Sequence, residues 1–192
     1  MSFYSKTLEA SYAKQLDKEL RASHAGETGA VWIYRGALCA EFILSLFKIV
    51  RSTSETTRFI HQHLKTEKHH LDIFENELPR FRGSFILPLW IGAGFMTGFI
   101  PRLLGENCFF YTIYCVEQFV DTHYENQCCQ LVMQPNPPSN VIDRLKRCQM
   151  DEQHHRDEAG SLMAKKTSLP MKLWGHLVNA GSSTAVSIAR FI

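Results

Sequence analysis

Hydrophobic positions recur at helical spacing along almost the whole of this chain, and no run of alternating apolar and polar residues is bounded by hairpin turns. The pattern breaks where Ser, Thr, Pro and Gly collect, as at 51–57 and 134–140. It therefore predicts one all-α domain over residues 1–192. The predicted helices span 11–49, 55–78, 106–133, 138–165 and 169–191.

One segment departs from the pattern of a plain soluble bundle. Residues 83–101 lie between Arg82 and Arg102 and carry no charge over 19 residues, nearly enough to cross a bilayer as a helix. Pro88 and three glycines disfavour a straight span, and Trp90 suits the level of lipid headgroups. We expect an element that lies in a membrane interface or dips in and returns. A buried connection in a soluble core is the main alternative.

Two of the predicted helices carry a glutamate followed three residues later by a histidine: Glu67 with His70, and Glu152 with His155. Positions i and i+3 lie about 60° apart around a helix, so each pair can aim at one point. A single such pair arises easily by chance among 19 acids and 9 histidines. Two pairs on two helices instead indicate two halves of a metal site.

The helices predicted at 11–49 and 106–133 each add one glutamate in apolar company. One glutamate from each of two helices, and a Glu-x-x-His pair from each of two others, make the di-iron site of four-helix carboxylate bundles. Four buried carboxylates are costly unless paired, and two divalent cations would balance them. The oxygen-rich donor set favours iron or manganese over zinc. The predicted metal ligands are Glu27, Glu67, His70, Glu117, Glu152 and His155.

The angular positions of other polar residues around their helices indicate whether they face the predicted ligands. His69 and His154, two residues after the glutamates of the two pairs, should face away and be solvated or support the site from outside. His63 shares the ligand face of its helix and is the main rival ligand. His24 and Asp121 are placed to hydrogen-bond ligands and orient them, with a satisfied core polar group as the equal alternative for each.

Two tyrosines repeat the symmetry of the ligands. Tyr34 lies seven residues after Glu27, and Tyr124 lies seven residues after Glu117. Seven residues are two helical turns, so each tyrosine shares the face of its glutamate. Both are candidate catalytic residues that shuttle protons or electrons, with space-filling as the alternative.

The two ligand-bearing hairpins differ in length. Glu27 and Glu67 are 40 residues apart, whereas the corresponding interval in the second half is 35. Level ligands on antiparallel helices require a turn near residue 47, but the polar break covers 51–57. Either the first helix ends early and the extra residues form a bend, or this hairpin overhangs the bundle.

Charge and cysteine content exclude several classes of protein. The formal net charge of +2 is spread along the chain, so no basic face indicates a nucleic-acid partner. Six cysteines show no CxxC spacing, which favours free thiols in a reducing compartment over a zinc ribbon or a disulfide framework. The N-terminal residues mix acids with bases, unlike a transit peptide, so we expect a mature chain.

Six stretches, taken in order, resemble the demethoxyubiquinone hydroxylases of ubiquinone biosynthesis. The most specific parts are HAGE at 24–27, VExxxxxHYxNQ at 116–127 and the segment ILPLWIGAGFMTG between the two halves. The resemblance covers nearly all of the chain from about residue 20, and it implies a ferritin-like di-iron monooxygenase attached to a membrane surface. The remaining stretches are RASHAGETGAVWIYRG, EKHHLDIFENELPRFR, DEQHHRDEAG and NAGSSTAVSIARFI.

The resemblance also implies a reaction and its surroundings. Two iron ions, held by the six predicted ligands, would hydroxylate the ring of a polyprenyl demethoxyubiquinone with dioxygen. No flavin or nicotinamide fingerprint is present, so electrons come from an external reductant, such as NADH-derived electrons, or through the quinone. We expect peripheral attachment to the cytoplasmic face of a bacterial inner membrane or the matrix face of the mitochondrial inner membrane. A homodimer and docking by other ubiquinone-biosynthesis proteins are compatible with this reading.

The resemblance further decides on which side of a membrane segment 83–101 must lie. A full crossing would separate the first two ligand glutamates from the last two by a bilayer, and the four could not share a metal pair. The segment must therefore stay on one side. With the amphipathic C-terminal helix at 168–192, it would form an apolar mouth for the isoprenoid tail.

Other functions fit part of the pattern. A ferritin-like ferroxidase would share the ligands but has no need of an uncharged segment, and a rubrerythrin-like peroxidase would bring a CxxC pair. A di-iron tRNA hydroxylase should show a basic face. A non-enzymatic quinone- or lipid-binding protein could keep the apolar mouth without the metal, which the six-ligand pattern disfavours.

Overall fold

The chain folds into helices, and a computed structural model describes residues 3–47, 53–134, 136–163 and 167–192. No strand occurs in these ranges, so the predicted all-α class is confirmed. The helices are α1 (Phe3–Leu46), α2 (Ser54–Asp72), the short π-helix η1 (Ile73–Glu77), α3 (Leu87–Leu104), α4 (Glu106–Val132), α5 (Ser139–Leu162) and α6 (Leu169–Ala189).

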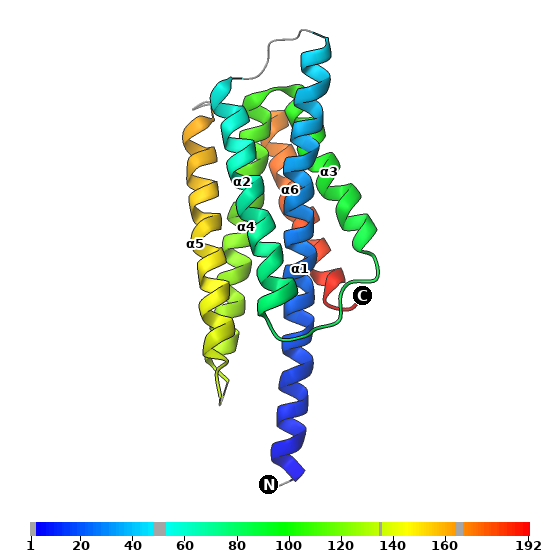
Figure 1. Ribbon diagram of the computed structural model, residues 1–192, viewed down its shortest axis with the longest axis vertical. Helices are drawn as coiled ribbons and strands as arrows, with labels where there is room; N and C mark the ends of the chain where they lie inside the picture. Colours follow the sequence, from blue (N-terminus) through cyan, green and yellow to red (C-terminus); the bar gives the residue numbers. More distant parts are fainter. Residues whose placement is uncertain (1–2, 48–52, 135, 164–166) are drawn as a thin grey trace.

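Four helices form a bundle, and two others cover one side of it (Figure 1). α1, α2, α4 and α5 run along the long axis of the molecule, α3 packs chiefly on α1, and α6 packs on α4 and α1. α1 and α2 make one antiparallel hairpin and α4 and α5 the other, while α3 carries the chain back so that α4 starts at the same end as α2 (Figure 1). This is the expected ferritin-like bundle with an additional C-terminal helix.

Two buried apolar clusters fill the bundle, one toward each end. Both take side chains from α1, α4 and α5, so each ties the two hairpins together. Because the predicted metal ligands come from positions between the two clusters along all four bundle helices, the polar site forms a layer inside an apolar core. One cluster includes Tyr34, Phe59, Phe109 and Ile113, and the other includes Leu20, Phe74, Leu131 and Leu145.

The uncharged segment forms a helix, α3, that touches the backbone of α1. A Cβ placed on Gly94 would lie 2.3 Å from the carbonyl oxygen of Gly29, and one on Gly98 would lie 1.8 Å from that of Ile33. Small residues permit such close helix packing. Pro88 stands in the first turn of α3, where a missing amide hydrogen is harmless. The sequence predicts no helix here, because glycine and proline have low intrinsic helix propensity. In the folded protein, packing against α1 stabilises the helix despite this low propensity.

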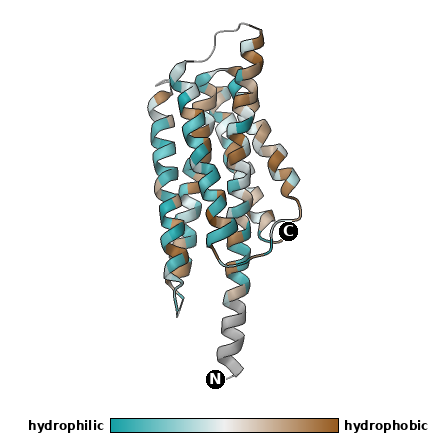
Figure 2. Cartoon of the chain, in the orientation of Figure 1, coloured by the Kyte–Doolittle hydropathy of each residue, from teal (hydrophilic) through white to brown (hydrophobic). Residues whose placement is uncertain are grey.

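Within the described part of the chain, two stretches are long and apolar enough to cross a bilayer by length and composition alone, Tyr12–Leu46 in α1 and Leu87–Leu104 in α3. The stretch in α1 supplies side chains to the bundle core, so a soluble core helix explains its composition. α3 is different because it lies outside the four-helix bundle (Figure 1) and is coloured mostly as hydrophobic in Figure 2. Four of its apolar residues are exposed: Leu89, Met96, Ile100 and Leu104.

The first hairpin overhangs the bundle, which was one of the two alternatives. α1 ends at Leu46, with a turn at residue 47, as the ligand spacing requires. At 1.5 Å per residue, α1 continues about 28 Å beyond Glu27, whereas Glu67 lies only about 20 Å from the start of α2. The end of α1 accordingly rises above α2 (Figure 1). Residues 48–52 of the expected break lie outside the described ranges.

The close contact between α1 and α3 generates a stability prediction. Replacing Gly98 with Ala inserts a methyl group into the backbone of α1, so we expect a loss of about 1–3 kcal/mol in the free energy of unfolding. Gly92 is the matched control, because a Cβ there meets nothing within 4 Å, and Gly92→Ala should be neutral or stabilise by up to about 1 kcal/mol. Thermal unfolding measures both. Equal effects of the two substitutions would contradict this packing.

Candidate metal centre

The six predicted ligands meet in the layer between the two apolar clusters, and each is at most 3% exposed. They form two groups in which one ligand atom from each residue lies within 4.8 Å of the others. Glu67 and Glu152 belong to both groups, so they are placed to bridge two cations. The first group adds Glu27 and His70, and the second adds Glu117 and His155. The structure brings all six together, and their role as ligands remains a prediction.

The polar atoms of this layer have too few hydrogen bonds for their burial. Both carboxylate oxygens of Glu67, Oε2 of Glu27 and Nδ1 of His70 make no hydrogen bond of good geometry with the described residues. Buried polar atoms are normally paired, so orphaned ones call for another partner. Carboxylate oxygens and imidazole nitrogens are suitable donors for iron or manganese. The donor set therefore fits a pair of divalent cations.

Crowded carboxylates perturb one another in this layer. Burial, followed by the charge of Glu152, raises the pKa of Glu67 to about 7. Burial and the charges of Glu152 and Glu67 also raise the pKa of Glu117 well above its ordinary value. Although burial opposes it, the carboxylates of Glu152 and Glu67 beside the imidazole raise the pKa of His155 to about 11. Without a metal, protons thus take the place that cations would fill.

The two histidines of the predicted set face shared carboxylates. Nδ1 of His155 lies 3.0 Å from both Glu67 and Glu152, and Nδ1 of His70 lies 3.0 Å from Glu152. Nε2 of His70 lies 3.1 Å from Asp151, the arrangement that orients a metal-binding imidazole. Sequence reasoning missed Asp151, although it directly precedes Glu152. A carboxylate adjacent to a Glu-x-x-His pair is too weak a signal without knowledge of the facing helix.

Two predictions about supporting residues are wrong. The imidazole of His24 contacts Glu75 and the ring of Phe81 rather than a ligand. The carboxylate of Asp121 accepts hydrogen bonds from Gln149, Gln153 and Arg156 on α5. Helical spacing predicts which side of a helix a residue occupies, but it does not predict the partner of its side chain. Both side chains contact groups on facing elements instead of the metal ligands.

The rival ligand His63 lies beside the centre but outside both ligand groups. Its ring packs 4.0 Å from that of His155, and its Nε2 lies 2.8 Å from Glu158. Burial, followed by the nearby histidines His155 and His154, lowers the pKa of His63 to about 3. His69 and His154 are exposed, as predicted.

The two tyrosines contact ligands across the hairpins. The hydroxyl of Tyr124, on α4, donates to Glu27 on α1, and that of Tyr34, on α1, lies 3.5 Å from Glu117 on α4. Burial and the adjacent carboxylates raise the pKa of both tyrosines well above 10. Both therefore stay protonated and can donate. Each tyrosine thus contacts the ligand glutamate of the other helix and not the one on its own helix. Spacing within a single helix cannot predict such a contact.

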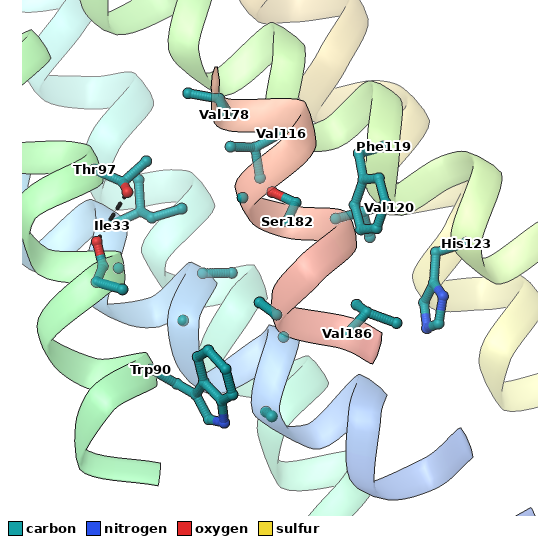
Figure 3. A pocket seen from close by; sticks show the side chains of 18 of the residues that line it. Ile33, Trp90, Thr97, Val116, Phe119, Val120, His123, Val178, Ser182 and Val186 are labelled. Atoms are coloured by element: carbon teal, nitrogen blue, oxygen red, sulfur yellow. Dashed lines mark hydrogen bonds between the residues drawn. The ribbon is translucent and has the colours of Figure 1, made fainter. Parts of the chain in front are cut away.

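A cavity of about 610 Å³ connects this layer to the surface between α1, α3, α4 and α6. Its inner end reaches Glu27, Glu117 and Glu152. Figure 3 shows apolar side chains from several helices around it, with Thr97, His123 and Ser182 as polar exceptions. The apolar labelled residues are Ile33, Trp90, Val116, Phe119, Val120, Val178 and Val186.

The outer end of the cavity opens on an apolar surface. Leu89 of α3 and Leu177 of α6 line the cavity and are 59% and 66% exposed. We use the name apolar mouth for Leu89 and Leu177 together with further exposed apolar side chains on α3, on α6 and at Phe85. It comprises Phe85, Leu89, Met96, Ile100, Leu104, Leu173 and Leu177.

Comparison of the sequence with known proteins identifies its family. The model of the family described as "Ubiquinone biosynthesis protein COQ7" matches residues 14–189. The 3-demethoxyubiquinol 3-hydroxylase of Rhodospirillum rubrum is 30% identical over 94% of this chain and 80% of its own length. The mitochondrial NADPH-dependent 3-demethoxyubiquinone 3-hydroxylases of Mus musculus and Caenorhabditis elegans are 28% and 27% identical over 95% of this chain, covering 81% and 94% of their lengths. The resemblance found in the sequence is confirmed: this chain belongs to the COQ7 family of ubiquinone-biosynthesis proteins.

Proposed function

We propose that this chain hydroxylates the ring of a polyprenyl demethoxyubiquinone, or of its quinol, at a pair of iron ions held between Glu67 and Glu152. The observation that carries the proposal is the junction of two features. Six buried metal donors lie at the inner end of a cavity whose walls are mostly apolar and whose mouth is apolar. The names of the relatives give the same reaction for those proteins.

The ligand groups define two metal positions. Glu27 and His70 would complete one position, Glu117 and His155 the other, and the two bridging carboxylates would serve both. Iron bound in such a site supplies activation of dioxygen, from which one oxygen atom enters the ring and the other leaves as water. Two electrons are therefore required from outside. The relatives named as NADPH-dependent support a reduced nicotinamide as their source.

The cavity suits a ring with an isoprenoid tail. The ring would lie at the inner end, against Glu27 and Glu117, where the mostly apolar walls would limit its contact with water. The tail would leave between Leu89 and Leu177. Tyr124 and Tyr34 would orient the two ligand carboxylates by donating hydrogen bonds, and either phenol could pass a proton to them.

The apolar mouth suggests how a water-insoluble substrate reaches the cavity. Exposed leucine, phenylalanine and methionine side chains on α3 and α6 would enter the interfacial region of a bilayer while the bundle stays outside it. We propose peripheral attachment at the cytoplasmic face of a bacterial inner membrane or the matrix face of the mitochondrial one. The mitochondrial relatives and the bacterial relative support these two locations equally.

The alternatives each leave one feature without use. An iron store or ferroxidase has no need of an apolar cavity that ends at the ligands. A non-enzymatic quinone carrier has no need of two groups of buried, orphaned metal donors. The hydroxylase uses both.

The proposed replacement of protons by cations predicts the pH dependence of stability. The pKa of the Glu67 carboxyl is about 7 in the folded chain, against an ordinary value of 4.5 that applies to the unfolded chain. Between pH 4.5 and 7, the folded protein therefore holds a proton that the unfolded chain has released. Rising pH in this window therefore destabilises the metal-free protein, by on the order of 3 kcal/mol from Glu67. Glu117 acts in the same direction. Below pH 6.5 the lowered pKa values of His63 and His123 act in the opposite direction. Thermal unfolding of metal-free protein should therefore show a midpoint that falls between pH 6.5 and 8.

Two controls accompany this measurement. Loading with Fe(II) or Mn(II) under anaerobic conditions should flatten the decline, because cations then balance the carboxylates. Glu67→Gln should flatten it in the metal-free protein. A midpoint that stays constant or rises with pH in the metal-free parent would contradict the proton-for-metal exchange.

The quinone profile of cells tests the reaction itself. Cells that lack their own demethoxyubiquinone hydroxylase and express this chain should convert the accumulated demethoxy compound to ubiquinone, as measured by mass spectrometry. Glu117→Ala should abolish conversion, because it removes a ligand, whereas Glu125→Ala, an exposed position on the same helix, should preserve it. Persistence of the demethoxy compound in cells with folded, iron-loaded parent chain would overturn the proposed substrate.

The same cells test the apolar mouth. Leu89→Lys combined with Leu177→Lys places two charges on exposed positions of α3 and α6, so folding should be retained. We expect the protein to move from the membrane fraction to the soluble fraction and ubiquinone to fall. Unchanged fractionation would argue against membrane attachment through this surface.

A further inference from the structure

The buried metal layer needs a path by which cations arrive from solvent. The six predicted ligands are at most 3% exposed, so none can take a hydrated cation directly from bulk water. The cavity leads to the layer, but its alanine, glycine, valine and leucine walls offer little to replace the water shell of a dication. Moving a charge through such surroundings is strongly unfavourable. A polar path on another side of the bundle is therefore expected.

A row of polar side chains lies on another side of the bundle, where α2 faces α5. Both helices are mostly hydrophilic in the view of Figure 2. Oε2 of Glu158 lies 2.8 Å from Nε2 of His63 and 3.8 Å from Nε2 of His154. The side chains become steadily more buried inward, with 68% of His154, 20% of Glu158 and 1% of His63 exposed.

The inner member of this row touches the proposed metal layer. The ring of His63 lies edge to face with that of the ligand His155, with centroids 4.0 Å apart. His63 precedes Glu67 by one turn on α2, and Glu158 follows His155 by one turn on α5. The row therefore approaches the second ligand group along both helices at once.

The donor chemistry of the row fits a cation in transit. A carboxylate only accepts, so Nε2 of His63 must carry the proton between it and Glu158. In the neutral ring Nδ1 then keeps a lone pair, and this buried atom has no hydrogen bond among the described residues. A cation that displaces the shared proton gains a carboxylate oxygen and two imidazole nitrogens, donors that suit Fe(II), Co(II) and Zn(II).

The ring geometry requires only a small adjustment by the exposed residue. The imidazoles of His63 and His154 have centroids 6.3 Å apart. His154 is largely exposed, so its side chain is free to close on a cation that Glu158 and His63 hold. A second polar contact at the edge of the metal layer is that of Asp151 with His70. It offers an incoming cation only one side chain outside the ligand set, whereas the row of His154, Glu158 and His63 offers three.

We propose that His154, Glu158 and His63 form a metal-loading site, which takes a divalent first-row cation from solvent and passes it to the buried ligand group containing Glu67 and His155. The inference rests on the proposed metal centre. It adds a second, weaker site that is needed for assembly and plays no part in the hydroxylation.

The rate of iron uptake tests the loading site. Metal-free full-length protein is mixed anaerobically with Fe(II), and the disappearance of chelator-accessible iron is followed by stopped flow. His154→Ala should slow uptake about tenfold, the lower range for loss of an outer metal contact, while the final content stays at two ions per chain. Glu158→Gln, which keeps the shape of the side chain, should slow it similarly. His69→Ala, an exposed histidine on α2, is the matched control and should match the parent.

Equilibrium binding supplies a second readout. Titration with Co(II), followed by its visible absorption, should show two tight ions and a weaker third in the parent, with the third lost in His154→Ala. Parent-like uptake in His154→Ala together with absence of a third ion in the parent would overturn the loading site alone. Failure of the parent to take up two ions would overturn the metal centre, and the loading site with it.

Discussion

The burial of four carboxylates in one layer of the core is the constraint on which this structure depends. Glu27, Glu67, Glu117 and Glu152 come from four different helices and are almost fully shielded from water. Uncompensated, such charges would be excluded or protonated. The pKa values of Glu67 and Glu117 are raised and that of Glu152 is lowered, and buried oxygens of Glu27 and Glu67 lack a hydrogen bond of good geometry among the described residues. These features indicate a layer adjusted to counter-charges. The apolar clusters on either side hold the helices in the register that keeps these carboxylates together.

This layer has two unlike surroundings, and the topology keeps them apart. On one side, α3 and α6 add apolar walls to the bundle, and the glycine contact between α3 and α1 brings those walls close to the ligands. On the other side, α2 and α5 face each other with histidines and acids. A hydrophobic substrate and a hydrated cation could thus reach the same centre from different sides of the bundle. The crossover through α3 makes this division possible because it covers only one face.

Much of the centre was predictable because its residues follow rules within single helices. The spacing of Glu67 and His70, repeated by Glu152 and His155, places donors on one face whatever the surroundings are. The contacts between helices were not predictable in this way. Tyr124 bonds Glu27 on another helix, and Asp121 turns to partners on α5, because side-chain choice depends on the facing element. α3 was missed as a helix because Gly94 and Gly98 weaken a helix in isolation and strengthen it against α1.

The central claim is that this layer binds two metal ions through Glu67 and Glu152. The most direct measurement is an anomalous difference map, at the iron absorption edge, of crystals loaded with Fe(II) under anaerobic conditions. The account predicts two peaks, each within bonding distance of carboxylate oxygens of both Glu67 and Glu152, with His70 next to one and His155 next to the other. A single peak, or iron bound away from this layer, would contradict it.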